Sequence, residues 1–153
     1  MSKLLAKPQM IIIQDSREQH PFSFSGIRPR PIIEVAGLQT GDYSIKGLEN
    51  DITIERKSLP DLFGSVGQAR ARFEREFGRM SELKYAAVVC EGDWWDVFKN
   101  PPARSRMEPK SVYATLIAWT QRYGIHFWPC PNRQFAEKTT YRLLERYWRD
   151  RQI

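Results

Sequence analysis

The chain has 153 residues, of which 41% are hydrophobic and 27% are charged. This is the composition of one globular domain, and it excludes a largely disordered chain. The formal net charge of +6 and the sequence pI of about 9.5 favour an acidic partner, and nucleic acid is the commonest such partner of a small basic domain.

Two further classes of protein are excluded by what the chain contains. Its two cysteines, Cys90 and Cys130, are too few for a disulfide scaffold and wrongly spaced for a zinc site. The first residues lack a signal peptide, and no segment approaches the roughly 18 apolar residues of a membrane span. We therefore expect a single domain over residues 1–153 with a flexible N-terminus at 1–8. We also expect it in the cytoplasm, or at the nucleoid if the source is a bacterium or phage, with no membrane partner.

The first third of the chain predicts strands. Short β-branched runs bounded by turn residues are typical of strands, and they occur at 10–14, 31–35, 41–45 and 51–57. The last two predict the arms of a hairpin with its turn at 46–50. The stretch 19–31 is rich in Pro, Ser, Gly and Arg and predicts a loop.

From Ser58, a helix N-cap residue, the apolar spacing becomes helical. Helices are predicted from 59 to 66, through Phe73 to Met80, from 112 to a stop at Gly124, and from Asn132 towards Trp148. Strands are predicted at 85–90 and 125–128. Because strands alternate with helices after an initial meander, we expect an α/β fold with a mixed central sheet flanked by helices.

The candidate chemistry lies on the strand 52–57. Side chains alternate along a strand, so Glu55 and Lys57 project from one face and Arg56 from the other. Asp42, on the neighbouring arm of the hairpin, brings a second carboxylate close. Two carboxylates can hold Mg²⁺ or Mn²⁺, and a lysine beside them can orient a water for phosphodiester hydrolysis. By spacing alone, a salt-bridge ladder on an edge strand explains the same residues.

Three motifs together are more specific. Asp15-Ser16-Arg17-Glu18 follows the first strand, Gly41-Asp42-Tyr43 opens the hairpin, and Glu55-Arg56-Lys57 is followed by three residues and Asp61. This pattern resembles the XPF-type nuclease family, the structure-specific DNA endonucleases with a restriction-endonuclease-like core. The resemblance extends over nearly the whole chain, including 123–125 and Asn132.

The resemblance implies roles for these residues. Asp42 and Glu55 would be metal ligands, and Lys57 would orient the attacking water. The residues that would support the metal site and the phosphate are Asp15, Arg17, Glu18, Arg56 and Asp61. Because the alternation places Arg56 on the opposite face from Glu55, an alternative is that Arg56 pairs with Asp15 or Asp61 as a supporting strut.

The chain also departs from the family pattern. The stretch between Asp42 and Glu55 is longer than usual, which predicts a larger hairpin turn. Neither a tandem helix-hairpin-helix module nor a helicase is present in the sequence. We therefore expect the substrate choice to come from the domain itself, from a partner chain or from dimerisation.

Two basic segments are candidate DNA contacts. The predicted helix after the catalytic strand carries Arg70, Arg72, Arg75 and Arg79, and a Pro-rich segment carries Arg104, Arg106 and Lys110. The alternative for the helix is a solvated face with Glu74 and Glu76 as salt-bridge partners.

The two late helices carry more apolar residues than one buried face needs. Tyr113 and Ile117 lie off the main stripe of the first, and Leu143 and Tyr147 lie beside the stripe of the second. We expect this surface to form a homodimer interface, unless the sheet covers it.

The sequence thus predicts an Mg²⁺- or Mn²⁺-dependent DNA endonuclease, with branched, flap or forked DNA as candidate substrates. A catalytically silent DNA-binding or scaffold module is one alternative, and a general duplex or RNA nuclease is another. All acidic and basic motif positions are filled, which favours activity.

Overall fold

The strands of the computed structural model, which describes residues 7–152, form a mixed sheet in the order β2-β1-β3-β4-β5-β6. They are β1 (Ile11–Asp15), β2 (Ile32–Ala36), β3 (Tyr43–Ile45), β4 (Ile52–Lys57), β5 (Tyr85–Cys90) and β6 (His126–Pro129). β3 pairs antiparallel with β1 and β4, whereas the pairs β1–β2, β4–β5 and β5–β6 are parallel. The expected hairpin is therefore confirmed as β3 and β4. Most of the N-terminal segment expected to be flexible lies outside the described residues.

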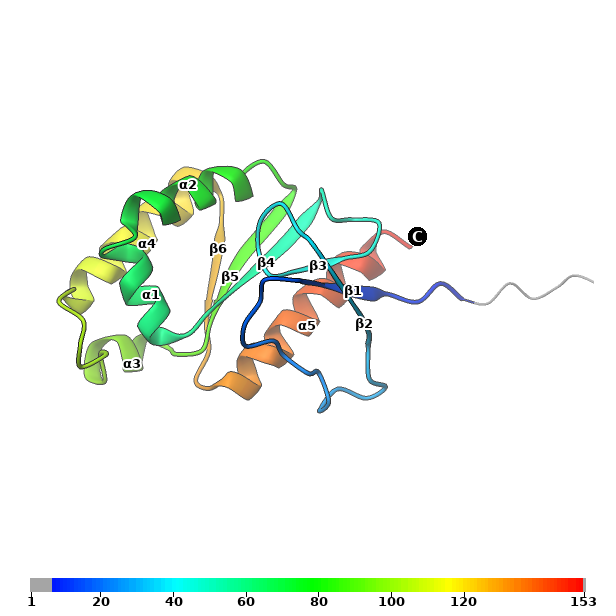
Figure 1. Cartoon of the computed structure of the whole chain (residues 1–153), viewed down its shortest axis with the longest axis horizontal. Helices are drawn as coiled ribbons and strands as arrows, with labels where there is room; N and C mark the ends of the chain where they lie inside the picture. The colour runs from blue at the N-terminus through cyan, green and yellow to red at the C-terminus, as the bar shows by residue number, and fades with distance from the viewer. Residues whose placement is uncertain (1–6, 153) are drawn as a thin grey trace, which may run out of the picture.

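Helices cover both faces of this sheet, as Figure 1 shows. They are α1 (Leu59–Val66), α2 (Arg70–Met80), α3 (Trp94–Lys99), α4 (Pro109–Tyr123) and α5 (Arg133–Asp150). α1, α2 and α4 lie on one side of the sheet, and α5 lies alone on the other. The expected mixed sheet flanked by helices is confirmed. None of the helices between residues 7 and 152 is long and apolar enough to cross a membrane.

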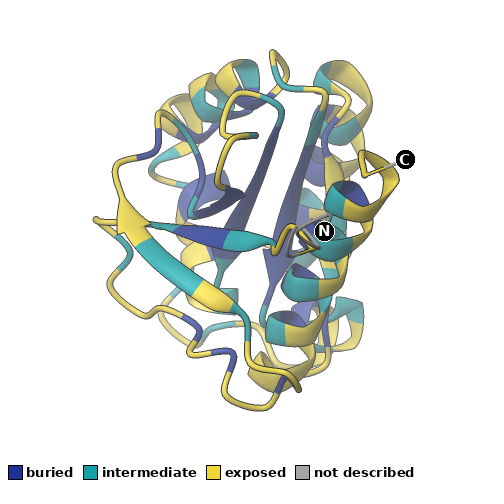
Figure 2. Cartoon of the chain, turned by 90° about the vertical axis from the view of Figure 1, so that its right-hand side faces the viewer, coloured by how far each residue is buried: buried dark blue, intermediate teal, exposed yellow. Residues whose placement is uncertain are grey.

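The sheet separates two hydrophobic cores, because successive side chains of a strand point to opposite faces. Ala87 and Val89 of β5 pack towards α5, whereas Ala86, Val88 and Cys90 pack towards α1, α2 and α4. Figure 2 shows the central strands buried between the helices, with β2 largely exposed at the edge. On β4, Ile52 and Ile54 belong to the α5 side, so Glu55 and Lys57 face α2 and α1.

The helix boundaries follow from local capping chemistry. The Ser58 side chain accepts a hydrogen bond from the Asp61 amide at 3.2 Å and begins α1. Gly124 ends α4 with a left-handed φ of 66°. The Asn132 side chain accepts from the Phe135 amide at 2.8 Å and begins α5. All three predicted caps are confirmed.

Candidate active site

Asp42 is held between β1 and β4 by three hydrogen bonds. Its amide donates to the Ile54 carbonyl at 2.9 Å, and its carbonyl accepts from the Asp15 amide at 2.8 Å. Its carboxylate accepts from the Arg56 amide at 2.7 Å. The preceding Gly41 has φ +79°, and a Cβ atom there would overlap the side chain of Thr53. Only glycine allows the chain to pass this close to β4, so Gly41 sets the position of the Asp42 carboxylate.

Glu55 and Lys57 project from the carboxyl end of β4 towards α2. Lys57 Nζ lies 3.6 Å from Glu55 Oε1 and 4.9 Å from the centroid of the Phe73 ring. Glu55 is buried, and its Oε2 has no hydrogen-bond partner in the described part of the chain. β4 lies inside the sheet between β3 and β5, so a salt-bridge ladder on an edge strand does not explain these residues.

The surroundings of the two carboxylates oppose their ionisation. Burial, with the nearby charge of Glu18, raises the pKa of Asp42 to about 7. Burial also raises the pKa of Glu55 well above its ordinary value, and the charges of Asp42 and Glu76 add to this effect. Lys57 favours the ionised form of both groups but does not offset the burial. The site therefore holds more negative charge than its own side chains compensate.

These features fit a hard divalent cation. No group of three or more His, Cys, Asp and Glu side chains within residues 7–152 converges as a metal cluster. Mg²⁺, however, is commonly bound by one or two carboxylates, with waters and substrate phosphates completing the coordination. Asp42 and Glu55 supply that number of carboxylates, and the unpartnered Oε2 of Glu55 is a buried oxygen without a donor.

Arg56 lies on the opposite face, as the alternation predicts, but the expected partners are wrong. Its guanidinium binds Glu18 at 2.9 Å and Glu91 at 2.8 Å, and it forms no salt bridge with Asp15 or Asp61 among the described residues. Although burial opposes it, the hydrogen bonds from Arg56 lower the pKa of Glu18. Arg56 is thus a buried strut that joins the turn after β1, strand β4 and the end of β5.

Asp15 and Arg17 pair with each other at 3.0 Å. Asp15 also accepts from the Leu38 amide at 2.9 Å, and Arg17 donates to the Leu38 carbonyl at 2.6 Å. Although burial raises it, these hydrogen bonds leave the pKa of Asp15 below its ordinary value. The pair therefore anchors the segment that leads into Asp42, while the Arg17 side chain remains 70% exposed near the site.

Asp61 lies in the first turn of α1 and is exposed. Together with His20, Arg56 and Glu91 it lines a pocket of about 640 Å³ beside the site. The structure therefore places Asp61 at the rim of this pocket, which Arg56 also lines.

Sequence reasoning missed the roles of Glu91, Arg133 and Glu76 at or beside the site. Glu91 accepts from both Arg56 and Arg133, the latter at 2.6 Å. Glu91 directly follows β5, which runs parallel to β4. Because the carboxyl ends of parallel strands meet at one edge of a sheet, the sequence position of Glu91 could have indicated that it lies near the site. Glu76, expected to pair with the arginines of its helix, instead contributes to raising the pKa of Glu55.

The arginines of α2 divide into two groups. Arg70 donates to Thr115 Oγ1 at 2.9 Å and stacks over Trp119 at 4.8 Å, so it joins α2 to α4. The others, Arg72, Arg75 and Arg79, are exposed and form no salt bridge with any residue between 7 and 152. Glu74 instead pairs with Arg122 of α4 at 3.0 Å.

Comparisons with known proteins give one match to a family model and two similar solved structures. Residues 14–143 match the model of the ERCC4 domain. The structure is similar to XPF from Aeropyrum pernix, with 22% identity and a TM-score of 0.70 over 88% of this chain and 60% of that one. It is also similar to XPF from Aeropyrum pernix in complex with DNA, with 21% identity and a TM-score of 0.72 over 93% of this chain and 66% of that one. No curated protein matches the chain.

The chain therefore spans about three fifths to two thirds of the archaeal chains that it resembles. At this level of identity the structural likeness shows the fold, and it confirms the expected restriction-endonuclease-like α/β class. The family model covers most of the sequence. The chain belongs to the ERCC4 domain family and has the fold of the XPF-type nuclease domain.

Proposed function

We propose that the protein is an endonuclease that hydrolyses DNA phosphodiester bonds with Mg²⁺ or Mn²⁺ at Asp42 and Glu55. The observation that carries this proposal is the pair of buried carboxylates beside Lys57, one of them with an oxygen that lacks a donor. Burying two such charges is costly when Lys57 compensates them only in part, so the arrangement is difficult to explain as a device for stability. It is well explained as a preorganised cation site.

Each residue of the site has a task in this chemistry. Asp42 and Glu55 would hold the cation, which when bound would neutralise charge on the scissile phosphate and acidify a water. Lys57 is held by Glu55 and by the Phe73 ring, so its ammonium can donate a hydrogen bond that orients the attacking water. Arg17, exposed at the rim, can bind a phosphate oxygen of the substrate.

DNA is the proposed substrate because the charge and the neighbouring surface suit it. The chain carries a net charge of +6, and the exposed arginines of α2 follow the catalytic strand. One of the similar archaeal structures is a complex with DNA. We propose branched, flap or forked DNA as the preferred form, and an intracellular site of action.

The test is a cleavage assay with labelled duplex, flap, fork and junction DNA and a matched RNA duplex. We expect cleavage with Mg²⁺ or Mn²⁺ and none in EDTA. Asp42→Asn and Glu55→Gln should each lower the rate by at least a hundredfold, because each removes one negative oxygen from the cation site. The control Asp150→Asn, in an exposed carboxylate far along the chain on α5, should cleave normally.

Three outcomes would redirect the proposal. Full activity in EDTA, or in both site variants, would contradict the metal mechanism. DNA binding without cleavage under any metal would support the silent scaffold module instead. Equal cleavage of RNA and all DNA forms would support a general nuclease.

Lys57→Ala should lose cleavage but keep the metal. The ammonium is not a cation ligand, and removing its positive charge leaves both carboxylates in place. Calorimetry should show Mg²⁺ or Mn²⁺ affinity at least as high as in the wild type. Lys84→Ala, which removes an exposed lysine, is the matched control for the loss of one charge. A collapse of metal affinity in Lys57→Ala alone would refute the assigned role.

A further inference from the structure

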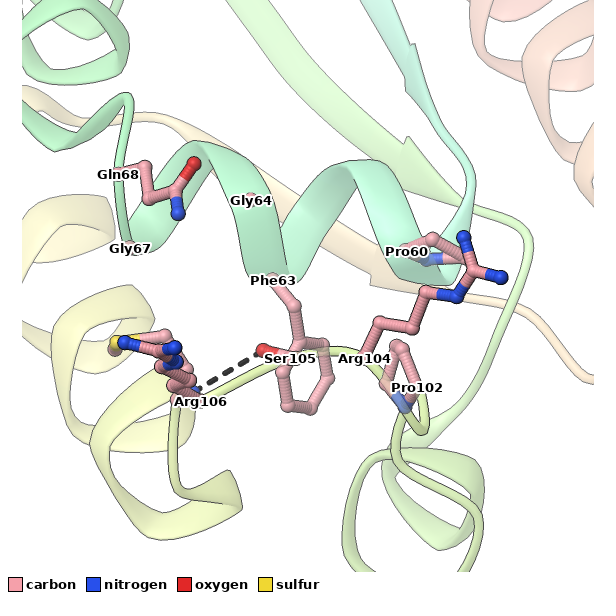
Figure 3. A pocket seen from close by; sticks show the side chains of 10 residues that line it. Pro60, Phe63, Gly64, Gly67, Gln68, Pro102, Arg104, Ser105 and Arg106 are labelled. Carbon is pink, nitrogen blue, oxygen red and sulfur yellow. Dashed lines mark hydrogen bonds between the residues drawn. The ribbon is translucent and has the colours of Figure 1, made fainter.

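A second pocket lies apart from the carboxylate site, between α1 and the segment 102–107. Its volume is about 810 Å³. Figure 3 shows α1 as its floor and the Pro-rich segment as its opposite wall, with Pro60 at one end of the helix and Gly67 at the other. Within the segment the Met107 amide donates to Ser105 Oγ at 3.1 Å, and the Met107 side chain packs against the core on this side of the sheet.

The charge of this pocket is one-sided. The ten described residues that line it include Arg104 and Arg106 and no carboxylate. Both arginines are exposed, and neither side chain forms a hydrogen bond or salt bridge with the chain between residues 7 and 152. In Figure 3 the Arg104 guanidinium lies towards Pro60, and Arg106 lies towards the Gly67 end. Two guanidinium groups at opposite ends of a pocket suit a ligand with more than one anionic group.

Gly64 keeps the floor of the pocket bare. Glycine in the interior of a helix costs stability relative to alanine. A Cβ atom at Gly64 would meet no atom within 4 Å, so no neighbouring side chain requires glycine there. Gly67 differs, because a Cβ atom there would come within 2.8 Å of the Met107 side chain. The glycine at position 64 therefore leaves the exposed surface of α1 without a side chain over the pocket.

The size and the walls select the ligand. A pocket of this volume takes one or two nucleotides, whereas a base-paired duplex is too wide to enter. The rings of Pro60 and Pro102 and the side chain of Met107 supply apolar faces for a base, and the arginines suit the phosphates on either side. Pro60 stands three residues after Lys57, so this pocket begins where the catalytic strand ends.

From this combination we propose that the pocket binds an unpaired DNA strand, namely one arm of a branched substrate. The proposal rests on the proposed function for the identity of the nucleic acid. This domain would thereby distinguish a branch from an ordinary duplex, because only an unpaired strand can pass along α1.

The test is fluorescence anisotropy in EDTA with a labelled oligo-dT strand and a blunt duplex of equal length. Gly64→Leu fills the floor, and we expect it to weaken oligo-dT binding about tenfold while leaving duplex binding within about twofold of the wild type. The control is Gly26→Leu in the loop before β2, because Gly26 is also exposed and a Cβ atom there would meet open space. Gly26→Leu should change neither affinity. Circular dichroism and thermal unfolding establish that each variant is folded.

A second pair of variants removes charge instead of space. Arg104→Ala with Arg106→Ala should lower oligo-dT affinity selectively. Arg142→Ala with Arg146→Ala removes the same charge from α5 and should lower both affinities slightly and alike. If Gly64→Leu does not fold, these two double variants still test whether the pocket binds an unpaired strand.

Unchanged oligo-dT binding in folded Gly64→Leu, or equal losses on strand and duplex, would overturn the proposal. These readouts are independent of cleavage. Failure of the wild type to cut any DNA with Mg²⁺ or Mn²⁺ would count against the proposed function alone.

Discussion

Asp42 illustrates how a single side chain can be placed at the expense of stability. Its carboxylate is held by the Arg56 amide, yet burial and the charge of Glu18 raise its pKa to about 7. The folded protein therefore binds a proton at the Asp42 carboxylate more tightly than the unfolded chain does. The protonated Asp42 carboxyl therefore contributes to the free energy of unfolding. This contribution is fully present below pH 3.8 and is lost as the pH rises towards 7.

This linkage predicts that Asp42→Asn stabilises the metal-free protein at pH 8. A shift from 3.8 to about 7 corresponds to at most about 4 kcal/mol, and relaxation of the site will lower that figure. Urea unfolding in EDTA should show the variant more stable than the wild type at pH 8 and nearly equal to it at pH 4. Mg²⁺ should stabilise the wild type and not the variant. A variant that is less stable than the wild type at pH 8 in EDTA would contradict this account.

The motif residues also differ in which of their contacts could be predicted from the sequence. Alternation along one strand placed Glu55 and Lys57 together and Arg56 on the other face. The partners of Arg56 depend on which strands lie beside β4 and on the turn after β1. Those are long-range features, so Glu91 and Glu18 could not be assigned to Arg56 from local spacing.

Among the elements, α2 combines two tasks on two faces. Phe73 and Phe77 are buried, and the charge of Glu76 helps to raise the pKa of Glu55 on β4. The arginines Arg72, Arg75 and Arg79 point to solvent. A helix that packs against the site and carries exposed positive charge on its outer side is suited to hold the DNA backbone near the site.

Replacing Arg72 and Arg75 with Ala should weaken binding to all DNA sequences alike. Each phosphate that the protein no longer neutralises should reduce the slope of log affinity against log salt concentration by roughly one. The measurement is a salt titration of DNA binding. Arg70→Ala is a contrasting variant, because Arg70 joins α2 to α4; it should lower thermal stability and leave the slope nearly unchanged. An unchanged slope in the Arg72 and Arg75 double variant would show that this face is only solvated.

Three helix ends were the most predictable features of the fold, whereas α3 was not predicted and α4 begins three residues before its predicted start. Ser58, Gly124 and Asn132 act through hydrogen bonds or backbone conformation within a few residues, and all three predictions are confirmed. The position of β1 between β2 and β3 could not be predicted in this way. It depends on pairing between segments that are distant in sequence.

At the scale of the whole molecule, exposed apolar side chains gather on α3 and α4. Trp95 is 67% exposed, and Phe98, Tyr113 and Ile117 are each more than 40% exposed. The extra apolar residues expected on α5 have a different explanation. Leu144 and Tyr147 are buried in the core, and Leu143 packs against it. The candidate dimer surface is therefore the outer side of α3 and α4.

We expect the protein to form a homodimer through this surface. Light scattering at high micromolar concentration should give twice the monomer mass, with and without DNA. Tyr113→Lys with Ile117→Lys should give the monomer mass, because burying two charges in an apolar interface is costly. Val35→Lys, on the exposed edge strand β2, should leave the dimer intact. A monomer mass for the wild type at every concentration would end the dimer proposal.

The close approach of Gly41 to Thr53 has a consequence for protein design. A designer who copies Gly-Asp and Glu-Arg-Lys into another sheet copies the reactive atoms but not their separation. That separation depends on the close approach of two segments of the chain, in which Gly41 lies against the side chain of Thr53, two residues before Glu55. The transferable unit is thus a piece of backbone geometry that includes Thr53, and a graft of the motif letters alone should yield an inert scaffold.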